Sequence, residues 1–182
     1  MGGGIAIGVA AVVFGAGCAW NPSHESGELP DLCRKVSDAS FREAGYLPET
    51  KLVKGDTEGS PAPECTLSSE NSGMLRIDLL TAPPLNGVAE YDYLLADART
   101  QATAHGIDQP VISSIHDRDA FTRPKAIISA DKSVPLGCST TFRLHSGAIE
   151  FTVLPRSDDL NDTAKACAAS LRVATTLEPA VD

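Results

Sequence analysis

The feature that most constrains this chain is its set of cysteines, which are spread along almost the whole length. The five are Cys18, Cys33, Cys65, Cys138 and Cys167. Cys18 ends an apolar N-terminal segment, so four cysteines remain for the rest of the chain, an even number that suits two disulfides in an oxidising compartment. Four cysteines allow three pairings. Chain locality favours Cys33–Cys65, which are 32 positions apart, and Cys138–Cys167, which are 29 positions apart.

Disulfides that close loops of this length would stabilise a small domain, because they lower the conformational entropy of the unfolded chain. On the chain-entropy account, each loop of about 30 residues stabilises the fold by roughly 3–4 kcal/mol. A zinc site is the competing interpretation, but no two cysteines stand within the gap of roughly two to four residues that tetrathiolate sites use. A catalytic thiol is a second alternative, although no sequence feature marks one cysteine as exposed or electropositive.

The N-terminal segment predicts the compartment. Residues 1–20, MGGGIAIGVAAVVFGAGCAW, contain no charged side chain, and the run 5–16 has the length of the hydrophobic region of a signal peptide. Small residues at 15–17 directly precede Cys18, as at a lipoprotein cleavage site, so we expect a lipid on the Cys18 thiol. An uncleaved short membrane anchor and a buried glycine-rich helix are the alternatives.

These features predict four segments. We expect a signal peptide or short membrane anchor over 1–17, a lipid-anchored polar tether over 18–29, a domain over 30–178 and a tail over 179–182. The domain would lie at the extracytoplasmic face of the cell membrane, with anchoring by an uncleaved segment or secretion as the alternatives.

The charge of the chain excludes some classes of partner. The 182 residues carry 24 acidic and 15 basic side chains, a net charge of −9. Binding to nucleic acid needs a clustered excess of lysine and arginine, so we expect no nucleic-acid partner. An anionic membrane surface would not attract the chain by charge either. The expected partners are the membrane, through the N-terminal lipid or anchor, and an envelope protein or a small-molecule ligand.

Hydrophobic periodicity predicts one α+β domain. Helices are expected over 31–36, 38–44 and 88–104, with a last helix that starts at the Ser157-Asp158-Asp159 cap. Strands are expected over 51–54, 65–69, 74–81, 120–129, 138–145 and 148–154, and 111–115 as a loop or edge segment. Turns between neighbouring strands predict a mainly antiparallel β-sheet with helices packed on one face, in a single domain.

The last predicted helix bears on the disulfide pairing. Its apolar stripe consists of Leu160, Ala164, Cys167, Leu171 and Ala174. Such a stripe faces the core. We therefore expect Cys167 to point at the sheet, where the strand that begins at Cys138 could meet it.

Four short motifs surround the cysteines and carry a family resemblance. They are Pro30-Asp31-Leu32-Cys33 at a helix start, Pro63-Glu64-Cys65 and Gly137-Cys138-Ser139 at strand starts, and Ala166-Cys167-Ala168 in the last helix. With the lipobox-like cysteine and the polar tether, the chain resembles an actinobacterial family of cell-wall lipoproteins that have a domain of unknown function. The resemblance covers roughly residues 12–178. It implies an exported, disulfide-bonded domain and supplies no catalytic residue.

The residues that could carry chemistry form no recognised motif. Two of the four histidines, His24 and His145, fall in the tether and at a hairpin end. His105, Asp108, His116, Asp117 and Asp119 lie close together in the sequence, but their spacing is not a known metal-ligand spacing, and a polar loop is the favoured explanation. The chain has no nucleophile elbow and no phosphate-binding loop after a strand. We therefore expect no catalytic residue, no metal and no cofactor.

Two classes of function remain. The first is an exported surface lipoprotein with a non-catalytic binding or sensory domain, which is not an enzyme. The alternative is an extracytoplasmic hydrolase whose active-site residues are dispersed along the chain. A pocket that gathers ionisable groups with perturbed pKa values would favour the hydrolase. An apolar groove would favour the binding domain.

Overall fold

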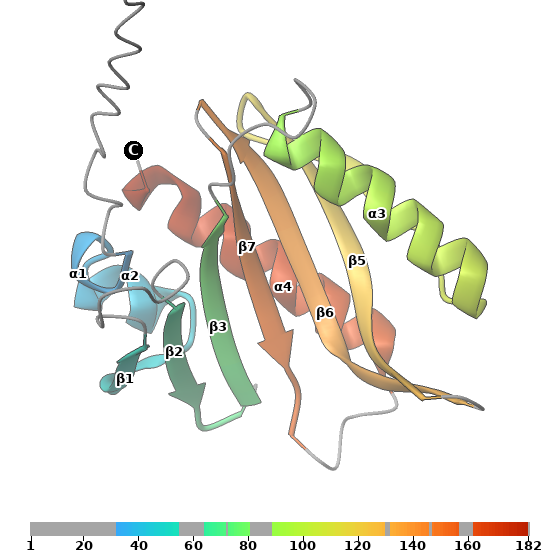
Figure 1. The fold of residues 1–182 in the computed structure, drawn as a ribbon. Coiled ribbons are helices and arrows are strands. Elements are labelled where there is room, and N and C mark those ends of the chain that lie inside the picture. The colour runs from blue at the N-terminus through green and yellow to red at the C-terminus, as the bar shows by residue number, and fades with distance from the viewer. Residues whose placement is uncertain are drawn as a thin grey trace, which may run out of the picture.

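The computed structural model describes residues 32–54, 64–71, 73–80, 89–129, 132–145, 147–156 and 162–181. Cys18, the predicted signal peptide or anchor, the tether and His24 lie outside these residues. Within them, seven strands form one sheet in the order β1-β2-β3-β7-β6-β5-β4, and every neighbouring pair is antiparallel (Figure 1).

The strands are β1 (Leu47–Lys54), β2 (Glu64–Ser69), β3 (Gly73–Leu80), β4 (Val111–Ile115), β5 (Arg118–Ser129), β6 (Lys132–Leu144) and β7 (Gly147–Leu154). The helices are α1 (Leu32–Lys35), α2 (Asp38–Glu43), α3 (Glu90–His105) and α4 (Thr163–Leu177), followed by the short 3₁₀ helix η2 (Glu178–Ala180). The predicted mainly antiparallel sheet is confirmed, and 111–115 is an edge strand.

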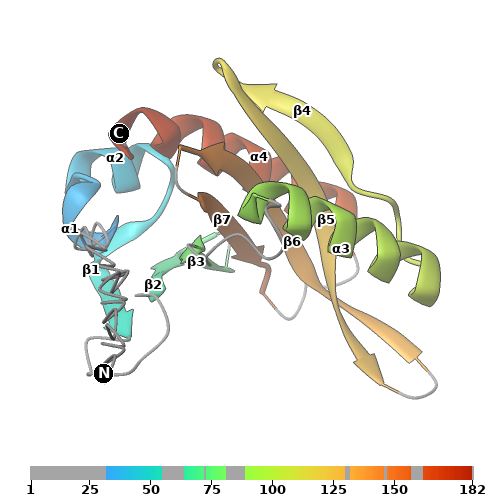
Figure 2. The same ribbon diagram turned by 45° about the horizontal axis from the view of Figure 1, so that its top comes forward.

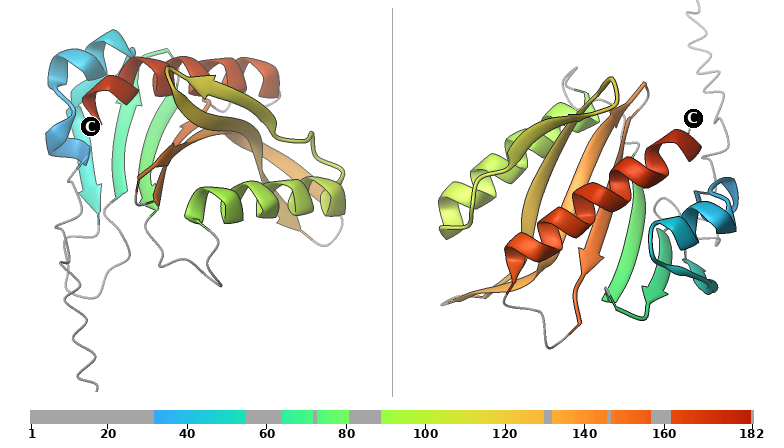
Figure 3. Two further views of the ribbon diagram at one scale, coloured as in Figure 1. Left: turned by 90° about the horizontal axis from the view of Figure 1, so that it is seen from above. Right: turned by 180° about the vertical axis from the view of Figure 1, so that it is seen from behind.

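One face of the sheet carries the main core. Alternation along β3 buries Leu75, Ile77 and Leu79 on this face and turns Arg76 and Asp78 to the other. The strands β6 and β7 add Phe142, Phe151 and Val153, and α4 covers them with Val173, Ala174 and Leu177. Helices α1 and α2 lie on the same side as α4, over the β1 end (Figure 3).

The opposite face is covered by α3. Tyr91 and Ala98 of this helix pack on Phe121 and Ala148, and the rings of Tyr91 and Phe121 meet edge-on with centroids 5.4 Å apart. The expectation that all helices share one face is therefore not confirmed, because α3 and α4 lie on opposite sides of the sheet (Figures 2 and 3). The physical reason is that the β5–β7 end of the sheet has apolar side chains on both faces, and both need cover.

The position of α4 differs from the prediction in its start and in its buried face. Its N-cap is Asp162, whose carboxylate accepts a hydrogen bond from the backbone N–H of Lys165 at 2.9 Å, and Ser157-Asp158-Asp159 lie outside the described residues. Leu171 is exposed, whereas Ser170 is fully buried. The Ser170 hydroxyl hydrogen-bonds to the carbonyl oxygen of Phe151 and to the hydroxyl of Thr140. A polar residue thus faces the sheet. Because a prediction from hydrophobic periodicity places serine on the surface, it selected the wrong face of α4.

Other boundaries also differ from the prediction, and β1, for example, begins at Leu47 rather than at residue 51. Strand β6 begins at Lys132, six residues before Cys138, and pairs there with the end of β5 in a long hairpin arm. Its Pro135 is accommodated next to an irregularity of register at Lys125/Ala126. The predicted tail at 179–182 contains part of the core, because Val181 is buried and its carbonyl oxygen accepts a hydrogen bond from Lys35 Nζ at 2.7 Å.

Among the described residues, no helix is both long enough and apolar enough to cross a bilayer.

Candidate functional site

Two disulfides attach helices to the sheet. Cys33–Cys65 joins α1 to β2, and Cys138–Cys167 joins β6 to α4. These are the two pairs that chain locality favours. Because such bonds persist in oxidising compartments, they suggest an extracytoplasmic location.

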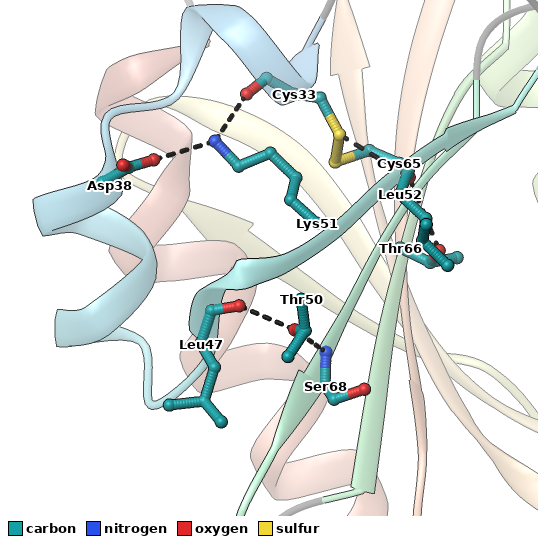
Figure 4. Close-up of a disulfide and its surroundings, with 9 residues drawn as sticks. All are labelled: Cys33, Asp38, Leu47, Thr50, Lys51, Leu52, Cys65, Thr66 and Ser68. Carbon is teal, nitrogen blue, oxygen red and sulfur yellow. Dashed lines mark hydrogen bonds and ion pairs between the residues drawn. A yellow bond between two sulfur atoms is a disulfide. The ribbon is translucent and has the colours of Figure 1, made fainter.

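The first disulfide is reinforced by a lysine (Figure 4). Lys51 of β1 donates from Nζ to the carbonyl oxygen of Cys33 at 2.9 Å and to Asp38 Oδ1 at 2.9 Å. The same ammonium lies 4.9 Å from the centre of the Phe41 ring. Covalent and polar contacts together hold α1 and α2 against β1 and β2.

A buried carboxylate organises the centre of the α3-side face. Glu150 of β7 is only 4% exposed and is contacted by two cations of β5, Lys125 Nζ at 2.7 Å and Arg123 at 3.2 Å. The hydroxyls of Ser139 and Thr141, both on β6, donate to the same carboxylate at 3.0 and 3.3 Å. Burial raises the pKa of the Glu150 carboxyl, but the charges of Lys125 and Arg123 outweigh it and hold the pKa at about 2.

A second carboxyl stands directly opposite Glu150. Asp78 of β3 is its cross-strand partner and accepts a hydrogen bond from Arg76 Nε at 2.8 Å. Burial raises the pKa of Asp78 above its ordinary value despite that bond, and the charge of Glu150 adds to the rise. Two carboxyls whose pKa values move in opposite directions are the arrangement that acid–base pairs use. Here, however, the Glu150 carboxylate already accepts contacts from four donors within the protein, which hold it in the ionised form.

A third cluster links the β4–β5 turn to the C-terminal end. His116 Nδ1 lies 2.7 Å from Glu178 Oε2, and Arg118 Nε donates to Glu178 Oε1 at 2.5 Å. His116 has a positive φ of 49° and lines two shallow depressions of about 500 and 540 Å³. Its ring is held by the buried Glu178, so the cluster ties the turn to η2.

The structure does not assemble the histidine–aspartate set of the 105–119 segment. His105 ends α3 on one side of the sheet, whereas His116 pairs with Glu178 beyond α4 on the other. In the described part of the chain, no group of three or more His, Cys, Asp or Glu side chains is placed to hold a metal. His145 is exposed at the β6–β7 turn.

An apolar cavity of about 160 Å³ opens beside the first half of α4. We call it the α4 cavity. Val153 and Pro155 of the β7 end form one wall, and Ala166 and Ala169 of α4 form the other. Small alanines on the helix leave a gap that larger side chains would fill.

The second disulfide holds this gap at a set width. Cys167 lies between the cavity-lining residues Ala166 and Ala168, and its partner Cys138 is the cross-strand neighbour of Val153. The helix wall and the sheet wall are thus joined covalently beside the cavity. The α4 cavity is therefore pre-formed, and its volume suits a group the size of a benzene ring rather than a whole drug-sized ligand.

Comparison with known proteins does not assign the chain to a family. No family model matches it, and no curated protein matches it. Among solved structures, one match is the solution structure of cyanobacterial PsbP (CyanoP) from Synechocystis sp. PCC 6803. That match has 11% sequence identity and a TM-score of 0.40, and it covers 68% of this chain and 86% of the other. At this level the likeness carries no conclusion about function.

Sequence reasoning missed both the Glu150 network and the α4 cavity. A lone glutamate inside an apolar strand, with Arg123 and Lys125 two positions apart in another strand, is a detectable signal for a buried ion pair. The cavity has a weaker signal, the alanine-rich run around Cys167. Its width depends on how α4 docks on the sheet, which residue types alone do not specify.

Proposed function

We propose that this chain is an exported surface protein, attached to the cell membrane through a lipid on Cys18, whose α+β domain binds a small molecule in the α4 cavity without catalysing a reaction. The observation that carries the proposal is the α4 cavity itself, an apolar, pre-formed hollow beside a disulfide. The resemblance to actinobacterial cell-wall lipoproteins supports the same compartment, and so do the two disulfides.

The electrostatics of the described residues support binding over catalysis. General acid–base catalysts work best with pKa values near the operating pH. Glu150, with a pKa of about 2, is held as a carboxylate by four donors and is far from that range. The α4 cavity is lined mainly by apolar atoms, which suits a binding site.

The alternative, an extracytoplasmic hydrolase, is favoured by one observation, the opposed pKa shifts of Asp78 and Glu150. In that case Asp78 would act as the acid. Purified protein assayed with 4-nitrophenyl glycosides, esters and phosphates tests it. Turnover that disappears in Asp78→Asn but survives in the surface variant Glu49→Gln would replace the binding proposal with the hydrolase.

Anchoring is tested by intact-mass spectrometry of protein extracted from membranes of its native host. We expect cleavage before Cys18, the added mass of a lipid and the loss of four hydrogens for two disulfides. A mature chain that retains residues 1–17 would overturn the lipid anchor.

Binding is tested by fluorine NMR with 4-fluorobenzyl alcohol, a neutral probe of suitable size, because a closed cavity of about 150 Å³ accommodates a benzene ring. We expect line broadening with the wild-type domain and none with Ala169→Leu, which fills the cavity. The matched control is Ala164→Leu, which adds the same side chain at an exposed position of α4 that does not line the cavity. Equal line broadening with Ala169→Leu and Ala164→Leu would show that the probe does not bind in the α4 cavity.

A further inference from the structure

The two edge strands of the sheet differ in composition. Strand β1, at one end, contains Pro48, Glu49, Lys51 and Lys54, and its pairing with β2 has an irregular register. Charged side chains, proline and irregular register are features that keep an edge strand from pairing with another chain. Strand β4, at the other end, has the sequence Val-Ile-Ser-Ser-Ile and pairs with β5 in regular register. It carries no charged residue and no proline.

Strand β4 also exposes apolar side chains at the rim of the sheet (Figure 2). Val111 is 66% exposed and Ile112 is 53% exposed. Helices α3 and α4 pack mainly on β5, β6 and β7. In the part of the chain that the structure describes, no strand pairs with the outer edge of β4. This edge is therefore a surface on which another strand could be added.

The pairing of β4 with β5 determines which backbone groups point outward. Ile115 and Arg118 are paired on either side of a two-residue turn. Residues in this position exchange hydrogen bonds, and bonded and non-bonded pairs then alternate along the strands. The backbone of Ser113 therefore bonds to β5. The N–H and C=O groups of Ile112 and Ser114 point away from β5 and are available to another strand.

A second copy of the chain, related by a two-fold axis, presents the same groups in reverse order. With the axis at Ser113, Ile112 of each copy lies opposite Ser114 of the other, and each such pair exchanges both of its N–H···O bonds. With the axis at Ile112, Pro110 would lie opposite Ser114, and proline has no N–H to donate. Backbone hydrogen bonding therefore favours the axis at Ser113.

The side chain of Ser113 is a separate observation that fits this arrangement. Its Oγ atom is buried and has no hydrogen-bond partner among the described residues. On the two-fold axis, Ser113 lies directly opposite Ser113 of the second copy in a non-bonded pair, where cross-strand side chains are closest. Serine hydroxyls opposite one another across such a pair can hydrogen-bond. Each copy thus supplies the partner that the Ser113 hydroxyl of the other lacks.

The charges next to β4 are compatible with this pairing. Residues 108–118 are all described, and β4 itself is neutral in a chain whose net charge is −9. In the same register, Asp108 comes level with Arg118 of the second copy, and Asp117 comes level with the neutral Gln109. Arg118 keeps its ion pair with Glu178 in its own copy. No two like charges of this segment lie directly opposite one another, an arrangement that would oppose pairing.

We propose that β4 is the surface through which two copies of this chain associate, by antiparallel pairing about a two-fold axis at Ser113. The two seven-stranded sheets then form one continuous sheet. The partner is a second copy because the backbone groups and the Ser113 hydroxyl are complementary to themselves. An interface of this small size is transient, and we expect a dissociation constant of about 10 µM. The inference depends on neither the lipid anchor nor the α4 cavity.

The test is disulfide cross-linking of two neighbouring positions. The full chain, purified from its native host as Ser113→Cys or as Ser114→Cys, is oxidised mildly at about 50 µM, above the expected dissociation constant. Covalent dimers are measured on non-reducing gels. We expect dimers from Ser113→Cys, because opposite Cα atoms about 4.5 Å apart are within reach of a disulfide. Position 114 is more exposed, but its two copies lie diagonally, about 8 Å apart, which is too far to bridge.

Two lysine variants test the edge itself, each introduced together with Ser113→Cys. Ile112→Lys gives β4 the kind of charge that β1 already carries, and we expect about tenfold less cross-linked dimer. The matched control is Leu52→Lys, which places the same charge on β1 at a residue that is 62% exposed. It should leave cross-linking unchanged. Thermal denaturation checks that both variants are folded, and the comparison of Ser113→Cys with Ser114→Cys needs neither lysine.

Each outcome bears on the β4 interface. Cross-linking that is specific to Ser113→Cys, lost with Ile112→Lys and retained with Leu52→Lys, supports it. No dimer from Ser113→Cys would overturn it, and so would equal amounts of dimer from Ser113→Cys and Ser114→Cys, which indicate random collision. Unchanged cross-linking in a folded Ile112→Lys variant would also overturn it.

Discussion

At the scale of single residues, Glu150 is a buried carboxylate held by two cations and two hydroxyls. Burying one carboxylate without partners would cost several kcal/mol, so it is stable only because Lys125, Arg123 and two hydroxyls surround it. The pKa of the folded state, about 2, lies below the ordinary value of 4.5. The carboxylate therefore contributes stability at every pH above about 4.5, and that contribution is lost as the pH falls from there toward 2.

We predict that Glu150→Gln destabilises the fold by about 3 kcal/mol at neutral pH, because two cations lose their buried partner. It should also flatten the loss of stability between about pH 4.5 and pH 2. Urea denaturation across this range measures both effects. The exposed Glu49→Gln is the control and should follow the wild type. A Glu150→Gln variant with wild-type stability at neutral pH would show that the ion pairs contribute no net stability.

Glycine at position 73 is required for two separable reasons. Its φ is +83°, and a Cβ there would overlap the carbonyl oxygen of Leu154 and crowd the backbone of Pro155. Gly45 has a similar φ of +90° but nothing within 4 Å of its Cβ position, so it reports the backbone strain alone. We predict a loss of about 3 kcal/mol for Gly73→Ala and about 1 kcal/mol for Gly45→Ala, measured by urea denaturation. Equal losses of stability in the two variants would mean that β3 moves away from β7 to relieve the overlap without lowering the free energy of unfolding.

At the scale of elements, the two disulfides are matched in loop length but differ in what they attach. Their sequence separations are 32 and 29 residues, so the chain-entropy account assigns each about 3–4 kcal/mol. Only Cys138–Cys167 secures α4, which forms one wall of the proposed ligand site. Each pair can therefore serve as the control for the other.

We predict that the double variant Cys138→Ala/Cys167→Ala increases hydrogen exchange in the first turns of α4 and weakens binding of 4-fluorobenzyl alcohol. The variant Cys33→Ala/Cys65→Ala should instead expose α1 and β2 and leave that binding intact. Hydrogen-exchange mass spectrometry and the fluorine NMR titration measure these effects. Identical exchange patterns in the two variants would show that the domain opens only as a whole.

The elements differ in how well sequence reasoning found them. Strong alternation around Leu75, Ile77 and Leu79 and the αL glycine at Gly106 placed β3 and the end of α3 within a residue or two. The buried face of α4 was predicted incorrectly because the buried hydroxyl of Ser170 hydrogen-bonds to Phe151 and Thr140. These residues are distant in the sequence and meet only in the folded chain. Helix amphipathicity read from residue types treats such a serine as surface.

At the scale of the whole molecule, we expect the two cross-links to supply a large share of the stability. A domain of this size is typically stable by about 5–15 kcal/mol, and two disulfides at about 3–4 kcal/mol each approach that total. The described residues enclose one main core and one small cluster beneath α3.

We predict that natively produced protein has no free thiol among Cys33, Cys65, Cys138 and Cys167, and that full reduction leaves the domain largely unfolded at physiological temperature. Thiol titration in denaturant counts the free cysteines, and thermal denaturation with and without reductant measures the second effect. Free thiols in the native protein would contradict an extracytoplasmic location. An unchanged melting temperature after verified reduction would instead show that the disulfides contribute little to the stability of the fold.

The sequence alone determined the features that depend on local spacing: the strand and helix types, the antiparallel hairpins, the charge balance and the favoured cysteine pairs. Only the tertiary structure decided which face each helix covers, how Glu150 finds Lys125 and Arg123, and where alanines on α4 leave a hollow against β7. The reason is physical. Periodicity specifies one element and its apolar side, whereas ion pairs and cavities arise where separate elements pack, and their geometry depends on residues that are distant in the chain.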